Sequence, residues 1–243
     1  MIAFMKAHWR WWVVVAFAIA MAWLESATVY YLRTLVGRIE PYQHDPLPIQ
    51  GTLGAVELIR EAATLVMLLA VGVIAGTTWR ARWGYSAVAF GIWDIFYYVF
   101  LRVMCGWPRS LFDWDVLFLI PLPWWGPVLA PVSIAVMMIV WGTIVTERRV
   151  MKEPTVAVRR QVWALNATGI ALALYVFMAD SLQQLPQLRQ GMIYALPTSF
   201  NWPLFIAALA LMAAPLVVSG VRPGSDWGQT GVRRGSDPAQ SGC

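Results

Sequence analysis

The sequence predicts an all-α fold: a polytopic integral membrane bundle of about six transmembrane helices. Of the 243 residues, 59% are hydrophobic and only 13% are charged, and the mean hydropathy is +0.60. A soluble domain is about 45–50% apolar and roughly 25% charged, so a bilayer must take up the excess apolar surface. The 15 Trp and eight Tyr suit a chain that crosses membrane interfaces, where amphipathic rings collect. We expect a multi-pass protein of a cell membrane, specifically a bacterial inner membrane.

Three long apolar runs predict the first three spans. The first covers about residues 11–36, and its start resembles a signal peptide because Lys6 and Arg10 precede an apolar core. We predict an uncleaved helix instead, since the apolar run continues past any cleavage point and is long enough to cross a bilayer. The second and third spans are about 54–77 and 84–105.

The fourth predicted span, about 124–146, follows a segment rich in proline and tryptophan. The run PLPWWGPVLAP contains four prolines, and proline removes a backbone donor and breaks helices. We therefore predict an interfacial or re-entrant segment at 119–128, whose broken backbone must be shielded by protein or water. The fifth and sixth spans are about 161–180 and 202–220.

The distribution of lysine and arginine predicts that both termini lie inside. Of the 18 Lys and Arg, twelve fall in the predicted inner segments and four on the outer side, and Arg60 and Arg102 lie within spans. This bias follows the positive-inside rule. Residues 1–220 then form the transmembrane domain. The tail, 221–243, is rich in Gly, Ser, Pro and Asp, cannot form a core, and is expected to be a disordered cytoplasmic segment.

Charged side chains inside the predicted spans are the main clue to function. A charge in hydrocarbon costs from a few to more than about ten kcal/mol, so such residues pair, face the protein interior or line a wet cavity. The six are Glu25, Glu57, Arg60, Glu61, Asp94 and Arg102, all in the first three spans. The predicted orientation puts nearly all of them in the outer half of the bilayer, where they can converge on one outward-facing site.

Helical spacing groups these residues further. Glu57 and Glu61 are four residues apart and share one face, so a cation or an arginine should lie between them. Asp94, Tyr98 and Arg102 form a second stripe at spacing four. The candidate ligand-binding residues, including two aspartates of the following outer loop, are Glu25, Glu57, Arg60, Glu61, Asp94, Tyr98, Arg102, Asp113 and Asp115. As structural alternatives, Glu57, Arg60 and Glu61 form an ion-pair clamp between helices, and Asp113 and Asp115 cap the following segment.

The sequence also excludes several chemistries. The chain has two His, and no HExxH, GxSxG, Walker A or GxGxxG pattern occurs, so we expect no haem and no zinc. A carboxylate-only site suits Mg²⁺, Ca²⁺ or Mn²⁺, so a divalent cation on Glu25, Glu61 and Asp94 is an open alternative. The net charge of +5 follows from topology, so we expect no nucleic-acid partner.

Three functions remain open from the sequence. The first is an outward-facing intramembrane carboxylate, arginine and tyrosine site that binds a small polar, cationic or lipid-headgroup ligand, with or without catalysis. The second is a subunit or assembly factor of a larger membrane complex, in which the charges are structural clamps. The third is a small proton-coupled transporter, since mid-depth carboxylates suit proton coupling. The expected partner is the lipid bilayer, with a homo-oligomer or a larger membrane complex as alternatives.

Overall fold

The computed structural model describes residues 8–42, 51–120, 122–150, 160–188, 196–197 and 199–220. Its elements are α2 (Trp9–Leu35), α3 (Gly51–Ala75), α4 (Trp79–Cys105), β1 (Trp114–Val116), β2 (Trp125–Pro127), α5 (Leu129–Val150), α6 (Arg160–Leu188), α7 (Trp202–Met212) and α8 (Ala214–Gly220). The tail that we expect to be disordered, 221–243, lies outside the described residues.

The predicted helical membrane bundle is confirmed. Five of the described helices, α2 to α6, are long and apolar enough to cross a membrane. The predicted sixth span differs, because residues 202–220 form two short helices that are separated at Ala213. Pro215 has no N–H to offer the carbonyl four residues earlier, which accounts for the break between α7 and α8. The count of six spans is therefore approximate.

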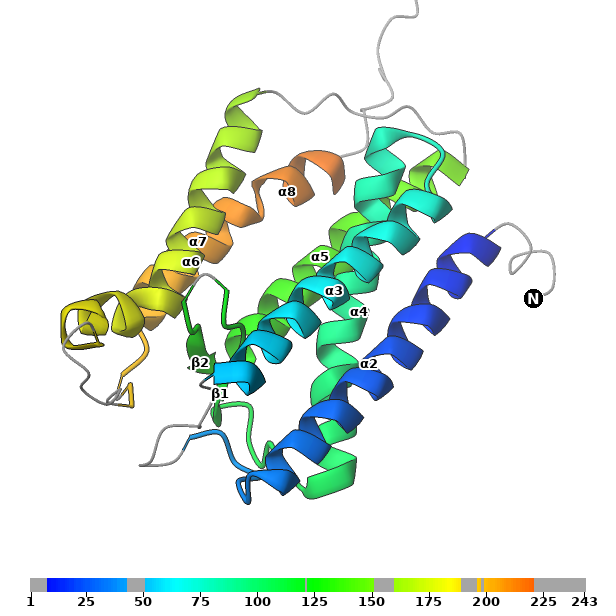
Figure 1. Cartoon of the computed structure of the whole chain (residues 1–243). Helices are drawn as coiled ribbons and strands as arrows, with labels where there is room; N and C mark the ends of the chain where they lie inside the picture. The colour runs from blue at the N-terminus through cyan, green and yellow to red at the C-terminus, as the bar shows by residue number, and fades with distance from the viewer. Residues whose placement is uncertain are drawn as a thin grey trace, which may run out of the picture.

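Helix α4 is the centre of the bundle. It packs against α2, α3 and α5, whereas α6 packs against α7, and α8 contacts both α5 and α6. Figure 1 shows α2 to α5 on one side of the molecule and α6 to α8 on the other. Glycines let α4 and α5 approach closely: a Cβ on Gly91 would lie 2.5 Å from the Ala135 carbonyl oxygen, and one on Gly142 would lie 2.4 Å from the Gly84 carbonyl oxygen.

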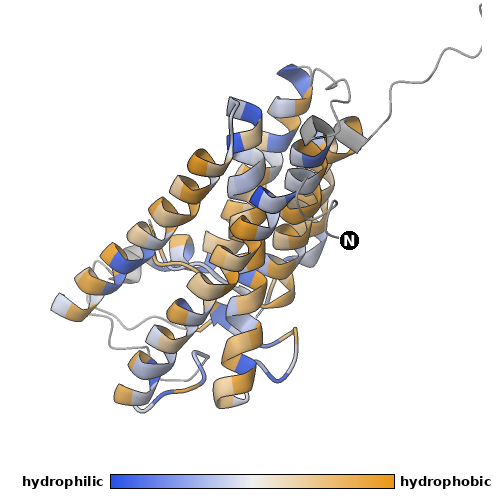
Figure 2. Cartoon of the chain, turned by 90° about the vertical axis from the view of Figure 1, so that its right-hand side faces the viewer, coloured by the Kyte–Doolittle hydropathy of each residue, from blue (hydrophilic) through white to orange (hydrophobic). Residues whose placement is uncertain are grey.

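Small and branched side chains form the core between these helices. Ala18 and Ala22 of α2 are fully buried and belong to one cluster with Val88 of α4. The first predicted span is thus an integral part of the core. The outer surface of the bundle carries large apolar side chains: Ile59 and Ile74 of α3 are 69% and 84% exposed. Figure 2 shows that hydrophobic residues predominate along the helices. Exposed apolar side chains are expected where lipid is the solvent.

The predicted helix-breaking segment, 119–128, contains the second strand of a β-hairpin that folds back into the bundle. Strands β1 and β2 pair antiparallel, and Asp115 lies opposite Gly126. From the tip, Phe118 stacks on Phe90 of α4 with ring centroids 6.4 Å apart. Phe90 is 15 residues before the end of α4, which corresponds to about 22 Å of helix. The break before the fourth span was predicted, but the two short strands were not, and α5 begins at Leu129 rather than near 124.

Candidate functional site

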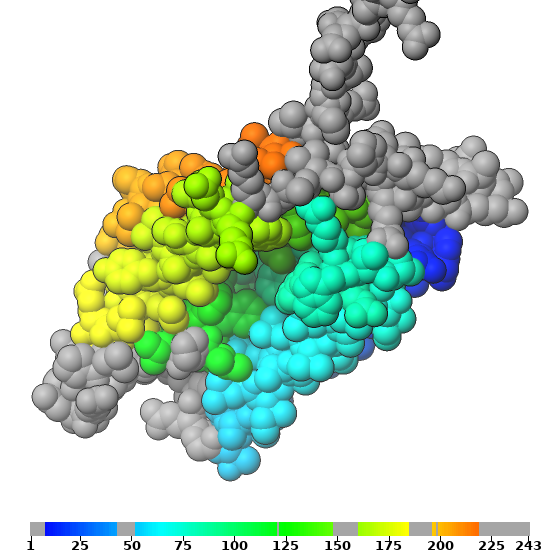
Figure 3. Space-filling model, turned by 90° about the horizontal axis from the view of Figure 1, so that it is seen from above, coloured from blue at the N-terminus to red at the C-terminus, as the bar shows by residue number. Residues whose placement is uncertain are grey.

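A cavity of about 470 Å³ lies between α3 and α6. Figure 3 shows a hollow there, with green residues of the hairpin and α5 region at its base. The end near the hairpin is lined by charged and aromatic side chains. The other end is lined by apolar side chains of α5, α6, α7 and α8, which are Met137, Met138, Ile170, Leu174, Met212 and Leu216. The cavity is therefore amphipathic along its length.

Arg60 is the centre of an ion-pair network at the charged end. Its Nε donates to Oε2 of Glu57 at 3.0 Å, and its Nη1 forms an ion pair with Oε1 of Glu25. The other oxygen of Glu25 accepts a hydrogen bond of 3.1 Å from the Thr64 hydroxyl. Because Glu25 is on α2 and Arg60 is on α3, the network holds these two helices together. It supports the structural alternative for Glu57 and Arg60.

Glu61 has a different partner from the one that its sequence spacing suggests. Its carboxylate accepts the Leu119 backbone N–H at 3.0 and 3.2 Å. Leu119 lies at the hairpin tip, where strand pairing has ended and the backbone donor needs a partner. Glu61 is 8% exposed. It therefore fixes the hairpin tip against α3 and closes one side of the cavity.

The base of the hairpin is held by a buried ion pair. Nη2 of Arg33 donates to Oδ1 of Asp115 at 3.0 Å, and these residues are 7% and 1% exposed. The Arg33 guanidinium also lies over the Trp107 ring, 4.4 Å from its centroid. Burial raises the pKa of Asp115, whereas Arg33 and hydrogen bonds from Val116 and Tyr98 favour the charged carboxylate. The pair joins α2 to β1.

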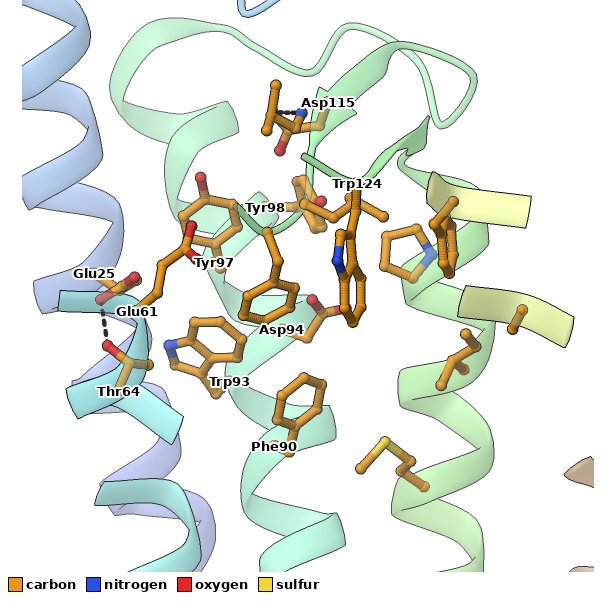
Figure 4. Close-up of a pocket in the computed structure, with 18 of the residues that line it drawn as sticks. Glu25, Glu61, Thr64, Phe90, Trp93, Asp94, Tyr97, Tyr98, Asp115 and Trp124 are labelled. Atoms are coloured by element: carbon orange, nitrogen blue, oxygen red, sulfur yellow. Dashed lines mark hydrogen bonds between the residues drawn. The ribbon is translucent and has the colours of Figure 1, made fainter. Parts of the chain in front are cut away.

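Asp94 has a buried carboxylate oxygen that no described residue binds. It is 7% exposed, it lines the cavity, and its Oδ2 has no hydrogen-bond partner among the described residues. Trp93, Trp124 and Trp141 also line the cavity, and their buried indole nitrogens likewise have no hydrogen-bond partner among the described residues. In Figure 4, Asp94 and Trp124 project from α4 and the hairpin into the same space. These four groups are available to a ligand.

The structure brings seven of the nine predicted residues to the cavity wall. They are Glu25, Glu57, Arg60, Glu61, Asp94, Tyr98 and Asp115. Arg102 and Asp113 lie elsewhere. Arg102 donates to the carbonyl oxygens of Gly106 and Pro108 at the end of α4, and Asp113 accepts the Arg109 backbone N–H at 2.7 Å. Asp113 thus closes the turn that precedes it, a structural role different from the predicted cap of the following segment.

The candidate set left out most of the cavity wall, including Arg33, Thr64, Trp93 and Trp124. Arg33 had a usable signal, because it is an arginine in an apolar helix, but its position near the helix end suggested an interfacial location. The two tryptophans had none, since the same residues are expected as interfacial anchors in any membrane protein.

The geometry does not favour the divalent-cation alternative. Within the described part of the chain, no three His, Cys, Asp or Glu side chains are placed to hold one metal ion. Glu25 binds Arg60 and Thr64, while Glu61 binds the hairpin, so both of these carboxylates are already occupied by protein groups.

Comparisons of the chain with protein-family models, curated proteins and solved structures found no match.

Proposed function

We propose that the protein binds a membrane amphiphile in this cavity, with the polar part of the ligand at the Asp94 end and its apolar chain along α5, α6 and α8. One observation carries the proposal: a single cavity joins a charged, aromatic end to an end lined by methionine and leucine. Its volume of about 470 Å³ lies within the range of about 300–1,000 Å³ of small-molecule sites. A purely structural ion-pair cluster has no need of the apolar extension.

The arrangement of the helices supports access from the bilayer. Helix α3 packs on α4 and α2, and α6 packs on α7 and α8, so neither closes extensively on the other. The hollow in Figure 3 lies between them. With the N-terminus inside, the hairpin and Asp94 face the outer side of the membrane, which we propose is a bacterial inner membrane. An amphiphile can then enter sideways while its chain stays in an apolar environment.

The test is the lipid content of the purified protein. Leu174 lines the apolar end, so Leu174→Trp should fill it, whereas Leu165 is on the same helix, is 46% exposed and does not line the cavity. The full chain should be purified in detergent, and its bound lipids identified by mass spectrometry. We expect an enriched amphiphile in the wild type and in Leu165→Trp that is lost from Leu174→Trp. Equal lipid content in all three would refute the proposal.

A second candidate is a subunit of a larger membrane complex, in which the ion pair between Glu25 and Arg60 serves only as a clamp between α2 and α3. In that case Arg60→Gln should weaken the assembly without changing the bound lipid. Gentle extraction followed by a mass measurement separates the two candidates. A lone chain that retains its amphiphile supports binding, and a hetero-complex without a specific lipid supports the subunit.

A further inference from the structure

We infer that the ligand of this cavity has an uncharged, hydroxyl-rich headgroup, such as a sugar or another polyol, on its apolar chain. The inference rests on the proposed function and specifies its substrate class. It follows from three features of the cavity: buried donors and acceptors without a described partner, arginines that are already paired with carboxylates, and aromatic rings beside Asp94.

The charge balance argues against an anionic headgroup. Five carboxylates line the cavity against two guanidiniums, and both guanidiniums are already engaged. Arg33 is paired with Asp115, and Arg60 is paired with Glu25 and Glu57. A phosphate or carboxylate headgroup would find no unpaired arginine among the described lining residues. It would instead meet five carboxyl groups, whose oxygens accept hydrogen bonds as the headgroup itself does, and every carboxyl that is ionised would repel it.

The unused donors argue against a cationic headgroup. An ammonium group can donate to Oδ2 of Asp94, but it cannot accept a hydrogen bond from an indole N–H. Trp93 and Trp124 would then keep buried donors without partners, which is costly. A hydroxyl group both donates and accepts, so it can satisfy the carboxylate and an indole together. Several hydroxyl groups on one headgroup can reach several of these sites.

The aromatic side chains beside Asp94 suit the apolar face of a sugar ring. Phe90 lies next to Trp93, with ring centroids 5.4 Å apart, and it stacks on Phe118. Phe118 in turn lies 5.2 Å from Trp124. These rings come from α4 and the hairpin, and Figure 4 shows the labelled members around Asp94. A ring that carries hydroxyl groups at its edge and C–H groups on its face matches a wall that is polar at Asp94 and apolar elsewhere.

The experiment compares three probes with the same ten-carbon chain: decyl glucoside, decyltrimethylammonium and decyl phosphate. Competitive binding to the full chain is measured by native mass spectrometry, in the wild type and in Leu174→Trp. We expect the glucoside to be preferred by about tenfold, the size of effect expected from one well-formed hydrogen bond. Preference for the ammonium or the phosphate probe, or no binding of any probe, overturns the inference.

Two substitutions at Asp94 separate charge from hydrogen bonding. Asp94→Asn keeps an acceptor oxygen without the charge, and Asp94→Leu removes both. For a hydroxyl ligand, Asp94→Asn should bind the glucoside within a few-fold of wild type, and Asp94→Leu should weaken binding by about tenfold. If Asp94→Asn binds as poorly as Asp94→Leu, the site recognises a cation and the inference fails. If a charged probe binds best and Leu174→Trp excludes it, the proposed function stands and only this inference fails. If Leu174→Trp excludes none of the three probes, the proposed function and this inference both fail.

Discussion

The ion pair between Arg33 and Asp115 gives the sharpest stability prediction. The side chains are only 8% and 1% exposed, and Nη2 of Arg33 lies 3.0 Å from Oδ1 of Asp115. Arg33→Met removes the cation and leaves the carboxylate buried with only the Val116 N–H and Tyr98 as partners. Breaking one side of a buried pair costs about 3–5 kcal/mol. We therefore expect Arg33→Met to lower the free energy of unfolding by about that amount.

The pH dependence of this loss has a definite sign. Burial raises the pKa of Asp115 and Arg33 opposes the rise, so Arg33→Met should raise that pKa further. A folded-state pKa above the unfolded value means that the folded protein holds the proton more tightly, and stability falls as pH rises between the two values. The deficit of Arg33→Met should therefore be smaller at acidic pH than at alkaline pH.

The assay is reversible unfolding in mixed micelles, followed by circular dichroism at several pH values. The matched control is the exposed pair of Arg109 and Glu40, in which the nitrogen–oxygen distance is 2.6 Å and the side chains are 76% and 43% exposed. Arg109→Met should cost about 0–1 kcal/mol. The double variant Arg33→Met with Asp115→Leu should recover part of the loss, because no buried charge is left without a partner. Equal losses for Arg33→Met and Arg109→Met would refute the reasoning.

Three further predictions concern the packing around the cavity. Gly91→Ala should destabilise the protein in thermal unfolding, because its Cβ would lie 2.5 Å from a backbone carbonyl oxygen of α5. Helix propensity alone predicts that this substitution stabilises the helix by about 1 kcal/mol, so a more stable variant would contradict the close contact. Asn166→Ala should lower the free energy of unfolding by about 0.6–2 kcal/mol, because Nδ2 of Asn166 donates to the Met212 carbonyl oxygen at 2.9 Å. Unchanged protease resistance of α6 and α7 would contradict this prediction. Glu61→Ala should speed hydrogen exchange of the hairpin, because it removes the acceptor of the Leu119 N–H. Glu61→Gln keeps an acceptor and should change the exchange rate less. Equal exchange rates in the two variants would show that the contact does not hold the hairpin tip.

The helices were predictable because each span is a long apolar run, and the bilayer imposes length and composition on it. The details that failed depend on tertiary contacts. Strands β1 and β2 are three residues each, too short to be stable or recognisable alone, and they form because the hairpin packs on α4 and α6. The sixth span was judged on composition, although Pro215 within it was visible and marks the break.

The candidate site was predictable in outline only. Spacing four correctly placed Asp94 and Tyr98 on the cavity wall, but a helix turns 100° per residue, so Arg102 has drifted by about 80° from Asp94 after eight residues. The sequence also grouped Glu57, Arg60 and Glu61. It could not assign their partners, because Arg60 binds a residue of α2 and Glu61 binds the hairpin. Those contacts depend on how distant segments pack.

Photo-crosslinking tests the central claim most directly, using a decyl glucoside with a diazirine in the middle of its chain. After illumination of the full-length protein in nanodiscs, mass spectrometry locates the labelled residues. Occupation of the cavity predicts labels on Met137 and Leu174, which line it, and loss of both labels in competition with unmodified decyl glucoside. Labels confined to Ile59 and Ile74, on the exposed outer surface of α3, with none in the cavity, would contradict a bound amphiphile.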